Sequence, residues 1–466
     1  MKSVALHNLG CKVNSYEIDV MQQMLVEKGY KIVPFDEFAD IYIINTCTVT
    51  NIADRKSRQM LHRAKKQNPG GIVVATGCYV QTGEEAVCLD EAIDLAIGNN
   101  RKKDLIAILE QFLEERETAL AKKEVATANH LEEQAIRKTL NNTTIIDINH
   151  TNEYERMFLT ETAEHTRAYI KIQDGCNQFC TYCIIPYARG RVRSRCEGDV
   201  LKEIKELAGR GYKEVVLTGI HLSSYGVDFN KEPLLLPLIK KIHEVEGIER
   251  IRLGSLEPRI VTEEFAKELA AMEKICPHFH LSLQSGCDAT LKRMNRRYDT
   301  KEFEEKVQIL RDAFKNPAIT TDVITGFPGE TEEEFLQTKE FLERIRFFEM
   351  HIFPYSKRQG TKAAVMENQI LEAVKKERSH VLLEMEKCQS LEFRKEYVGQ
   401  VLSVLFEEEK EINGESYMIG HTKEYVKVAL FVSEKSKNEI EALENQVRTV
   451  LGKHMLTDDI VYAEEI

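Results

Sequence analysis

Six of the 11 cysteines in this 466-residue chain stand at spacings that could do chemistry. Thiolates are ligands for zinc and for the iron of iron–sulfur clusters. Disulfides are rare in cytosolic proteins, so cysteines in a long chain of this kind indicate metal binding or catalysis. The six are Cys11, Cys47, Cys78, Cys176, Cys180 and Cys183.

The central trio forms a C-x3-C-x2-C array at Cys176, Cys180 and Cys183, directly after an expected strand at residues 168–173. Chemistry in βα proteins is placed on such loops at the carboxyl ends of strands. A closed zinc site needs a fourth ligand, and neither Cys nor His follows at zinc-finger spacing. Three thiolates on a cubane iron–sulfur cluster leave one iron with an open position, as a reactive site requires. Zinc and ordinary buried thiols remain the alternatives.

The N-terminal trio is dispersed, but each member comes immediately after an expected strand, at residues 4–9, 41–45 and 72–76. The carboxyl ends of neighbouring parallel strands meet at one edge of a sheet, so Cys11, Cys47 and Cys78 can meet at one metal centre. The alternative is that each is a small buried hydrophobe. The other five cysteines have no partner spacing.

The elements that must position these thiols alternate between strand and helix, which predicts α/β units with parallel sheets. We expect an N-terminal open parallel α/β domain at 1–116, a linker at 117–160 and a partial (β/α)6 barrel with a C-terminal helix at 161–396. Residues 397–466 show short alternating apolar runs and an Asn413-Gly414 turn, which predict a small all-β barrel.

The segment from Asp174 to Pro186, with Arg189-Gly190 after it, reads DGCNQFCTYCIIP. It resembles the radical S-adenosylmethionine (SAM) signature of the methylthiotransferases. The segments LGCKVN at Cys11 and NTC at Cys47 are similar to those on which that family holds a second iron–sulfur cluster. Residues 400–466 resemble its RNA-binding TRAM domain, a small β-barrel, although they carry 14 acidic and 7 basic residues.

The resemblance implies an enzyme with two 4Fe-4S clusters and SAM as cofactors. Cys176, Cys180 and Cys183 would be catalytic and hold the SAM-binding cluster, while Cys11, Cys47 and Cys78 would be the metal ligands of the second cluster. Three strand-end segments, at 217–219, 283–286 and 325–330, are similar to the family's segments around SAM. Expected SAM contacts are Thr218, Gly219, Gln284 and Ser285.

The implied activity is a tRNA methylthiotransferase. One SAM methylates a sulfur, a second supplies a radical that removes hydrogen from carbon 2 of adenine, and the methylthio group is transferred there. The wording LGCKVNSYE at residues 9–17 looks most like the branch acting on threonylcarbamoyl-modified adenosine beside the anticodon. The branch acting on isopentenyl-modified adenosine is the alternative, and a non-catalytic iron–sulfur or zinc RNA-binding protein is a distant one.

The net charge of −12 argues against general nucleic-acid affinity, so an RNA must meet local basic patches. Four arginines between residues 189 and 195 predict a phosphate-binding surface beside the central cysteines, or else a salt-bridged face. No apolar run of membrane-spanning length occurs, so we expect a cytoplasmic protein. The expected partners are a tRNA anticodon stem-loop, an electron donor such as a flavodoxin or ferredoxin, and a sulfur donor of unknown identity.

Overall fold

The computed structural model describes residues 2–121, 143–162 and 166–466. Part of the expected linker, residues 122–142, and residues 163–165 of the expected central domain lie outside the described residues. The described chain forms two compact units, treated one at a time below. Unit 1 comprises residues 1–163, 173–179 and 183–195, and unit 2 comprises residues 164–172, 180–182 and 196–466.

Unit 1 contains a six-stranded sheet in which every pair of neighbours runs parallel. This confirms the predicted N-terminal α/β fold. The edge strands β2 and β6 escape the sequence pattern because they have only three and two residues. In sheet order the strands are β2 (Lys31–Val33), β1 (Ser3–Asn8), β3 (Ile41–Thr46), β4 (Ile72–Gly77), β5 (Leu95–Ile97) and β6 (Thr143–Thr144).

The helices of unit 1 connect these parallel strands. In α2 the hydroxyl of Thr50 accepts a hydrogen bond from the backbone of Ala53 and fixes where the helix begins. Leu61 and Ala64 of α2 pack against Ile44 and Val73 of the sheet in one apolar cluster. The helices are α1 (Lys12–Glu27), α2 (Asn51–Gln67), α3 (Cys78–Thr82), α4 (Glu84–Leu89), α5 (Leu105–Ala121) and, in the later segment, α7 (Ile185–Ala188).

Unit 2 is built on an arc of six strands, which agrees with the predicted partial barrel. β9 and β10 pair in parallel, as do β11, β12 and β13, and single bridges from Ile251 to Ile275 and from Leu256 to Leu281 join the two groups. The last two residues of β7 belong to unit 1, where they pair with β8 (Arg193–Ser194). The strands of the arc are β7 (Arg167–Asp174), β9 (Glu214–Gly219), β10 (Arg250–Leu253), β11 (His278–His280), β12 (Ala318–Thr325) and β13 (Glu349–Pro354).

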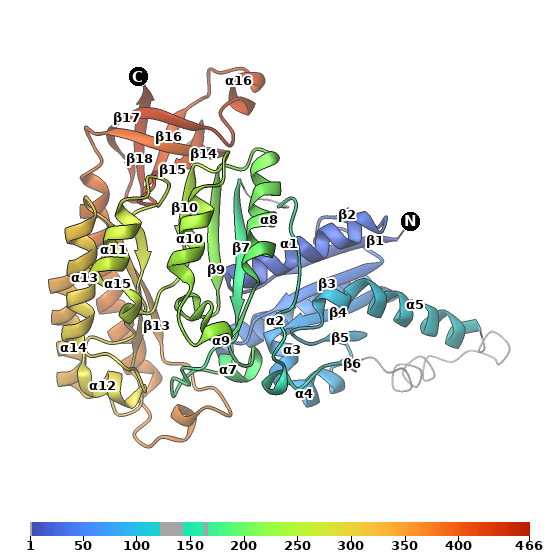
Figure 1. Cartoon of the computed structure of the whole chain (residues 1–466). Coiled ribbons are helices and arrows are strands. Elements are labelled where there is room, and N and C mark those ends of the chain that lie inside the picture. The colour runs from blue at the N-terminus through green and yellow to red at the C-terminus, as the bar shows by residue number, and fades with distance from the viewer. Residues whose placement is uncertain (1, 122–142, 163–165) are drawn as a thin grey trace. The chain divides into compact units, whose positions relative to one another are not determined.

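Helices cover one face of this arc, as Figure 1 shows for the green to orange part of the chain. Phe279, Ile319 and Val323 of the strands share an apolar core with Phe303 and Phe341 of the helices. Because side chains alternate along a strand, the opposite face of the arc is left for other residues. The main helices are α8 (Glu197–Gly209), α10 (Leu235–His243), α11 (Glu263–Ala270), α13 (Thr300–Ala313), α14 (Glu332–Ile345) and α15 (Glu372–Lys395); shorter ones are α9 (Val227–Asn230) and α12 (Asp288–Arg293).

The C-terminal part of unit 2 is a closed five-stranded barrel, as the alternating pattern predicts. Four of its five strand pairings are antiparallel. No helix in the described part of the chain is both long and apolar enough to cross a membrane. The barrel strands are β14 (Val401–Ile412), β15 (Glu415–His421), β16 (Lys427–Phe431), β17 (Val447–Thr457) and β18 (Ile460–Glu465), with α16 (Lys437–Glu441) between β16 and β17.

Two buried arginines of β10 connect the amino ends of the arc strands to this barrel. Glu214 of β9 accepts a hydrogen bond from Arg252 Nε at 2.7 Å, and both side chains are buried. The Arg252 guanidinium lies 4.7 Å from the centre of the Tyr425 ring, and Arg250 donates to the carbonyl oxygen of His421 at 2.8 Å. The amino-terminal end of the inner face is therefore filled by protein.

Candidate functional site

Cys11, Cys47 and Cys78 follow three neighbouring strands of unit 1. They come after β1, β3 and β4, and β3 pairs with both of the others. Cys47 and Cys78 are buried and Cys11 is exposed. Burial, the neighbouring Cys78 thiol and, more weakly, Cys11 raise the pKa of Cys47 to about 12. The structure thus brings the three thiols into one electrostatic neighbourhood, and metal binding at Cys47 would release its proton.

Two glycines allow this close approach. Gly10 and Gly77 have φ values of +108° and +97°, in the region that favours glycine. A Cβ at Gly10 would lie 2.9 Å from the Cβ and 3.0 Å from the Sγ of Cys47, and a Cβ at Gly77 would lie 2.5 Å from the carbonyl oxygen of Thr46. The loops after β1 and β4 therefore leave no room for a larger residue beside the thiols.

A guanidinium is directed at one of these sulfurs. Arg189 Nε donates to Cys78 Sγ at 3.2 Å, and the amide of Asn99 lies 3.6 Å from the same sulfur. Arg189 also forms ion pairs with Glu17 and, at 3.3 Å, with Asp174, and donates to Asn14 Oδ1 at 2.6 Å. Charge-assisted hydrogen bonds of this kind stabilise a thiolate ligand.

The arginine segment after the central cysteines differs from one of the two expectations for it. Arg189, Arg193 and Arg195 are at most 2% exposed, and Arg189 and Arg193 face Asp174 within unit 1. The prediction that this segment is a phosphate-binding surface is wrong for these three residues. The charges of Arg189 and Arg193 are compensated by Glu17 and Asp174, which lie outside the arginine segment and are missed by a local charge count.

Cys176, Cys180 and Cys183 lie on the loop between β7 and α7, and all three are half-buried. Within unit 1, the Cys176 backbone donates to the carbonyl oxygen of Gly190 at 3.0 Å. Within unit 2, Arg296 Nη1 donates to Cys180 Sγ at 3.3 Å. A donor thus reaches a sulfur in each trio. Phe179 in this loop has a φ of +51°, an uncommon conformation that is enriched at functional sites.

The four expected SAM contacts lie at the carboxyl ends of arc strands in unit 2. Thr218 and Gly219 end β9, and Gln284 follows β11 with a φ of +76°. The Gln284 backbone is held against β12 by a 2.8 Å hydrogen bond to the carbonyl oxygen of Asp322. Ser285 is fully buried, main chain included, and its hydroxyl lies 3.2 Å from that of Thr338.

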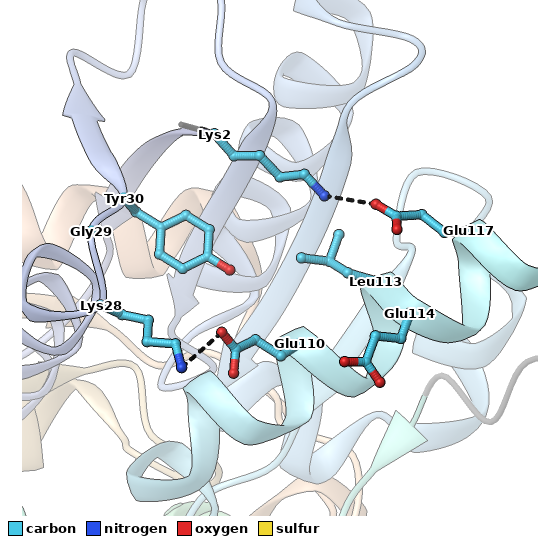
Figure 2. Close-up of a pocket in the computed structure, with 8 residues that line it drawn as sticks. All are labelled: Lys2, Lys28, Gly29, Tyr30, Glu110, Leu113, Glu114 and Glu117. Atoms are coloured by element: carbon cyan, nitrogen blue, oxygen red, sulfur yellow. Dashed lines mark hydrogen bonds and ion pairs between the residues drawn. The ribbon is translucent and has the colours of Figure 1, made fainter.

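A cavity of about 480 Å³ in unit 1, shown in Figure 2, is remote from this chemistry. It is lined by residues at the start of β1, the end of α1 and along α5. Lys2 pairs with Glu117 across it at 3.3 Å, and Lys28 pairs with Glu110 at 3.1 Å. Lys2 precedes β1, whereas Cys11 follows it, so the cavity lies at the opposite edge of the sheet.

Comparisons with known proteins find matches for the two segments that carry the cysteine trios. Residues 170–342 match the Radical SAM superfamily and residues 3–98 match the Uncharacterized protein family UPF0004. The chain is 41% identical over 429 residues to the threonylcarbamoyladenosine tRNA methylthiotransferase MtaB of Bacillus subtilis (strain 168), covering 92% of this chain and 90% of that protein. The chain belongs to the radical SAM methylthiotransferase family. Its members use SAM and two 4Fe-4S clusters.

A second relative belongs to the same family, and one solved structure has a similar fold. It is 35% identical over 408 residues to the tRNA-2-methylthio-N(6)-dimethylallyladenosine synthase of Thermoanaerobacter sp. (strain X514), covering 86% of this chain and 81% of that protein. Its fold is similar to that of the radical SAM methyltransferase TsrM from Kitasatospora setae, with a TM-score of 0.51 and 15% identity over 78% of this chain and 74% of that one. The fold expected from the sequence is confirmed.

The cysteines fit the clusters that the family requires, because donors reach both trios. Sequence patterns missed the residues that supply these donors, Arg189 beside Cys78 and Arg296 beside Cys180. One signal was present in α1, where Asn14 and Glu17 stand three and six residues after Cys11. Both are buried on the helix face that also carries Val13 and Val20. Polar residues at helical spacing on an apolar face indicate buried partners.

Proposed function

We propose that this methylthiotransferase adds a methylthio group to carbon 2 of threonylcarbamoyl-modified adenosine next to the anticodon of tRNA. The observation that carries the proposal is the convergence of Cys11, Cys47 and Cys78 at one edge of the unit 1 sheet, in addition to the SAM-cleaving motif at Cys176, Cys180 and Cys183. Two cysteine trios fit a reaction that needs both a radical and a sulfur. The identities of 41% and 42% to MtaB proteins support the threonylcarbamoyl substrate.

When bound, one cluster would supply the electron that cleaves SAM, and the other would carry the sulfur that replaces hydrogen on the base. The protein's own residues perform the remaining tasks. Cys176, Cys180 and Cys183 hold one cluster and leave one iron free for SAM. Thr218, Gly219, Gln284 and Ser285 line the strand ends where SAM binds. Cys11, Cys47 and Cys78 hold the second cluster.

The charged side chains around the sulfurs position the ligands. Arg189, fixed by Glu17 and Asp174, holds the Cys78 sulfur in place and excludes water from it. Arg296 has the same role at Cys180, and the carbonyl oxygen of Ser282 accepts a hydrogen bond from it at 2.8 Å. Fixed donors aimed at the ligand sulfurs preorganise each metal site.

The partners follow from the reaction. The substrate is a tRNA anticodon stem-loop, whose unpaired bases can be turned out of the stack. A small reductant such as a flavodoxin or ferredoxin supplies the electron that cleaves SAM. The protein acts in the cytoplasm, where tRNA is modified.

Mass spectrometry of tRNA nucleosides tests the proposal. Cells lacking this protein should lose the methylthio derivative of threonylcarbamoyladenosine, keep the unmethylthiolated precursor, and recover the derivative when the gene is restored. Loss of methylthio-dimethylallyladenosine instead would assign the chain to the other branch. An unchanged nucleoside profile would overturn both assignments.

A further inference from the structure

The inner face of the arc in unit 2 carries a polar cluster that the reaction above does not use. Phe279, Ile319 and Val323 point to the helices, so the intervening residues point to the opposite face. There, His280 of β11, Asp322 of β12 and His351 of β13 each offer a ligand or hydrogen-bonding atom within 4.8 Å of the others. We refer to these three residues as the inner trio.

Two members of the inner trio are fixed by hydrogen bonds. The His280 ring contacts the hydroxyl of Thr320 through Nδ1 at 3.0 Å and Asp322 Oδ2 through Nε2 at 3.2 Å. Partial burial opposes ionisation of Asp322, but the His280 hydrogen bond and the charges of His351 and Arg296 hold its pKa below the ordinary value. Asp322 is therefore a carboxylate at neutral pH.

The third member, His351, lies at the surface of unit 2. The ring of His351 stacks on that of His280 at 5.7 Å between centroids, and His351 is exposed. The ring nitrogens of His351 form no hydrogen bond with the described residues of the chain. Asp322 Oδ1 likewise forms no hydrogen bond with the described residues. The trio thus presents a donor and an acceptor that are not satisfied internally.

Within unit 2, a chain of contacts connects the inner trio to Cys180. Ser282 stands two residues after His280, roughly 7 Å along an extended chain, and its carbonyl oxygen holds Arg296. Arg296 in turn donates to Cys180 Sγ at 3.3 Å. On the other side, Tyr425 packs against the His278 ring at 5.2 Å and closes the face. Arg296, whose charge also acts on Asp322, thus links the inner trio to Cys180.

We propose that His280, Asp322 and His351 recognise the polar substituent on the substrate adenine and so select threonylcarbamoyl over dimethylallyl. This rests on the proposed function and names the residues behind its specificity. The threonylcarbamoyl group offers a hydroxyl and ureido N–H groups to Asp322, and a carboxylate to the histidines. A dimethylallyl group offers no hydrogen bond and would leave the ionised Asp322 desolvated and unpaired, which is costly.

The inference is tested with three synthetic anticodon stem-loops that differ only in the target adenosine: threonylcarbamoyl, dimethylallyl or unmodified. His351→Phe keeps a planar ring and lies on an exposed position, so the fold should tolerate it. Asp322→Asn keeps the size of the side chain and removes its charge. His454→Phe, the same substitution at an exposed position in the C-terminal barrel, is the matched control.

For the threonylcarbamoyl stem-loop, kcat/KM should fall about 10- to 100-fold in His351→Phe and Asp322→Asn, because a charge-assisted hydrogen bond is lost. Most of the change should be in KM. In His351→Phe, values for the unmodified stem-loop and for SAM cleavage without RNA should not change. The ratio of kcat/KM for the threonylcarbamoyl stem-loop to kcat/KM for the dimethylallyl stem-loop should fall in both variants. His454→Phe should match the wild type.

Three outcomes would overturn the inference. Equal losses on all three stem-loops would show a structural role, and an unchanged preference would show that recognition lies elsewhere. A preference that disappears on chelation and returns with an added divalent cation would show that the trio acts through a metal ion. If the wild type methylthiolates none of the stem-loops while it cleaves SAM, the proposed function itself fails.

Discussion

Arg189 Nε donates to the sulfur of Cys78 at 3.2 Å, although the two residues stand 111 positions apart. Both belong to unit 1, and the arginine is fully buried with Glu17 as its ion-pair partner. A buried arginine with this geometry orients a metal ligand through its hydrogen bond and does not act as a surface charge. The sequence segment around the SAM-cleaving motif therefore also supplies a residue to the second cysteine trio.

Replacing Arg189 with Lys should lower the reduction potential of the N-terminal cluster. Hydrogen bonds to cluster sulfurs favour the more negative, reduced state, and lysine cannot reproduce the guanidinium fork. The measurement is a redox titration followed by electron paramagnetic resonance, in a background where Cys176, Cys180 and Cys183 are all replaced by alanine. Arg191→Lys, a half-buried neighbour, is the control. If Arg189→Lys and Arg191→Lys had the same reduction potential, Arg189 would not act on the cluster.

Gly77→Ala should remove the N-terminal cluster, whereas Gly29→Ala should not. Both glycines have positive φ, at +97° and +92°, so each substitution strains the backbone by about 1–3 kcal/mol. Only at Gly77 does the added Cβ meet another atom, the Thr46 carbonyl oxygen at 2.5 Å, while nothing lies within 4 Å at Gly29. Iron content and urea unfolding separate the two effects. Full iron in Gly77→Ala would show that the turn tolerates a side chain.

Substitutions in the two cysteine trios should abolish different steps of the reaction. Cys180→Ala should eliminate formation of 5′-deoxyadenosine, because SAM cleavage needs the central cluster. Cys47→Ala should retain part of that cleavage but form no methylthio product. Chromatography of 5′-deoxyadenosine and of digested RNA measures both. If Cys47→Ala made the methylthiolated nucleoside at the wild-type rate, the N-terminal trio would have no part in sulfur transfer.

Glu214→Gln should destabilise unit 2 by about 3–5 kcal/mol, because Arg252 would lose its buried partner. Burial opposes ionisation of Glu214, but Arg252, Arg167 and Arg250 hold its pKa below the ordinary value. The stabilisation is thus complete above pH ~4.3, the ordinary glutamate value, and is lost as pH falls through the lowered pKa.

Guanidinium unfolding at several pH values measures the difference between the wild type and Glu214→Gln. That difference should be constant near pH 7 and shrink in acid. Glu206→Gln, which breaks an exposed pair with Arg210, should cost about 0–1 kcal/mol. A difference that grew toward low pH would contradict the assignment of Glu214 as an ionised group.

The sequence predicts the elements that have a strong local pattern. The parallel strands before Cys11, Cys47 and Cys78 are runs of β-branched and apolar residues, so their order and their ends could be predicted. β2 and β6 could not, because two or three residues carry no periodicity. The C-terminal helix expected at the end of the 161–396 region forms as α15, at Glu372–Lys395.

The buried charges could not be predicted from local composition. The arginines between 189 and 195 stand in a stretch without acidic residues. The partners of Arg189 and Arg193, Glu17 and Asp174, come from α1 and β7. Only the folded chain brings these charges together, so a count along the sequence assigns such arginines to the surface. The inner trio was missed for a similar reason, since its members come from three different strands.

The metal content of the anaerobically reconstituted protein tests the central claim most directly. Two 4Fe-4S clusters predict about eight iron and eight sulfide ions per chain. Replacing Cys11, Cys47 and Cys78 together with alanine should leave about four of each, with SAM cleavage retained. Zinc in place of iron, or an iron content that the triple substitution leaves unchanged, would contradict the account.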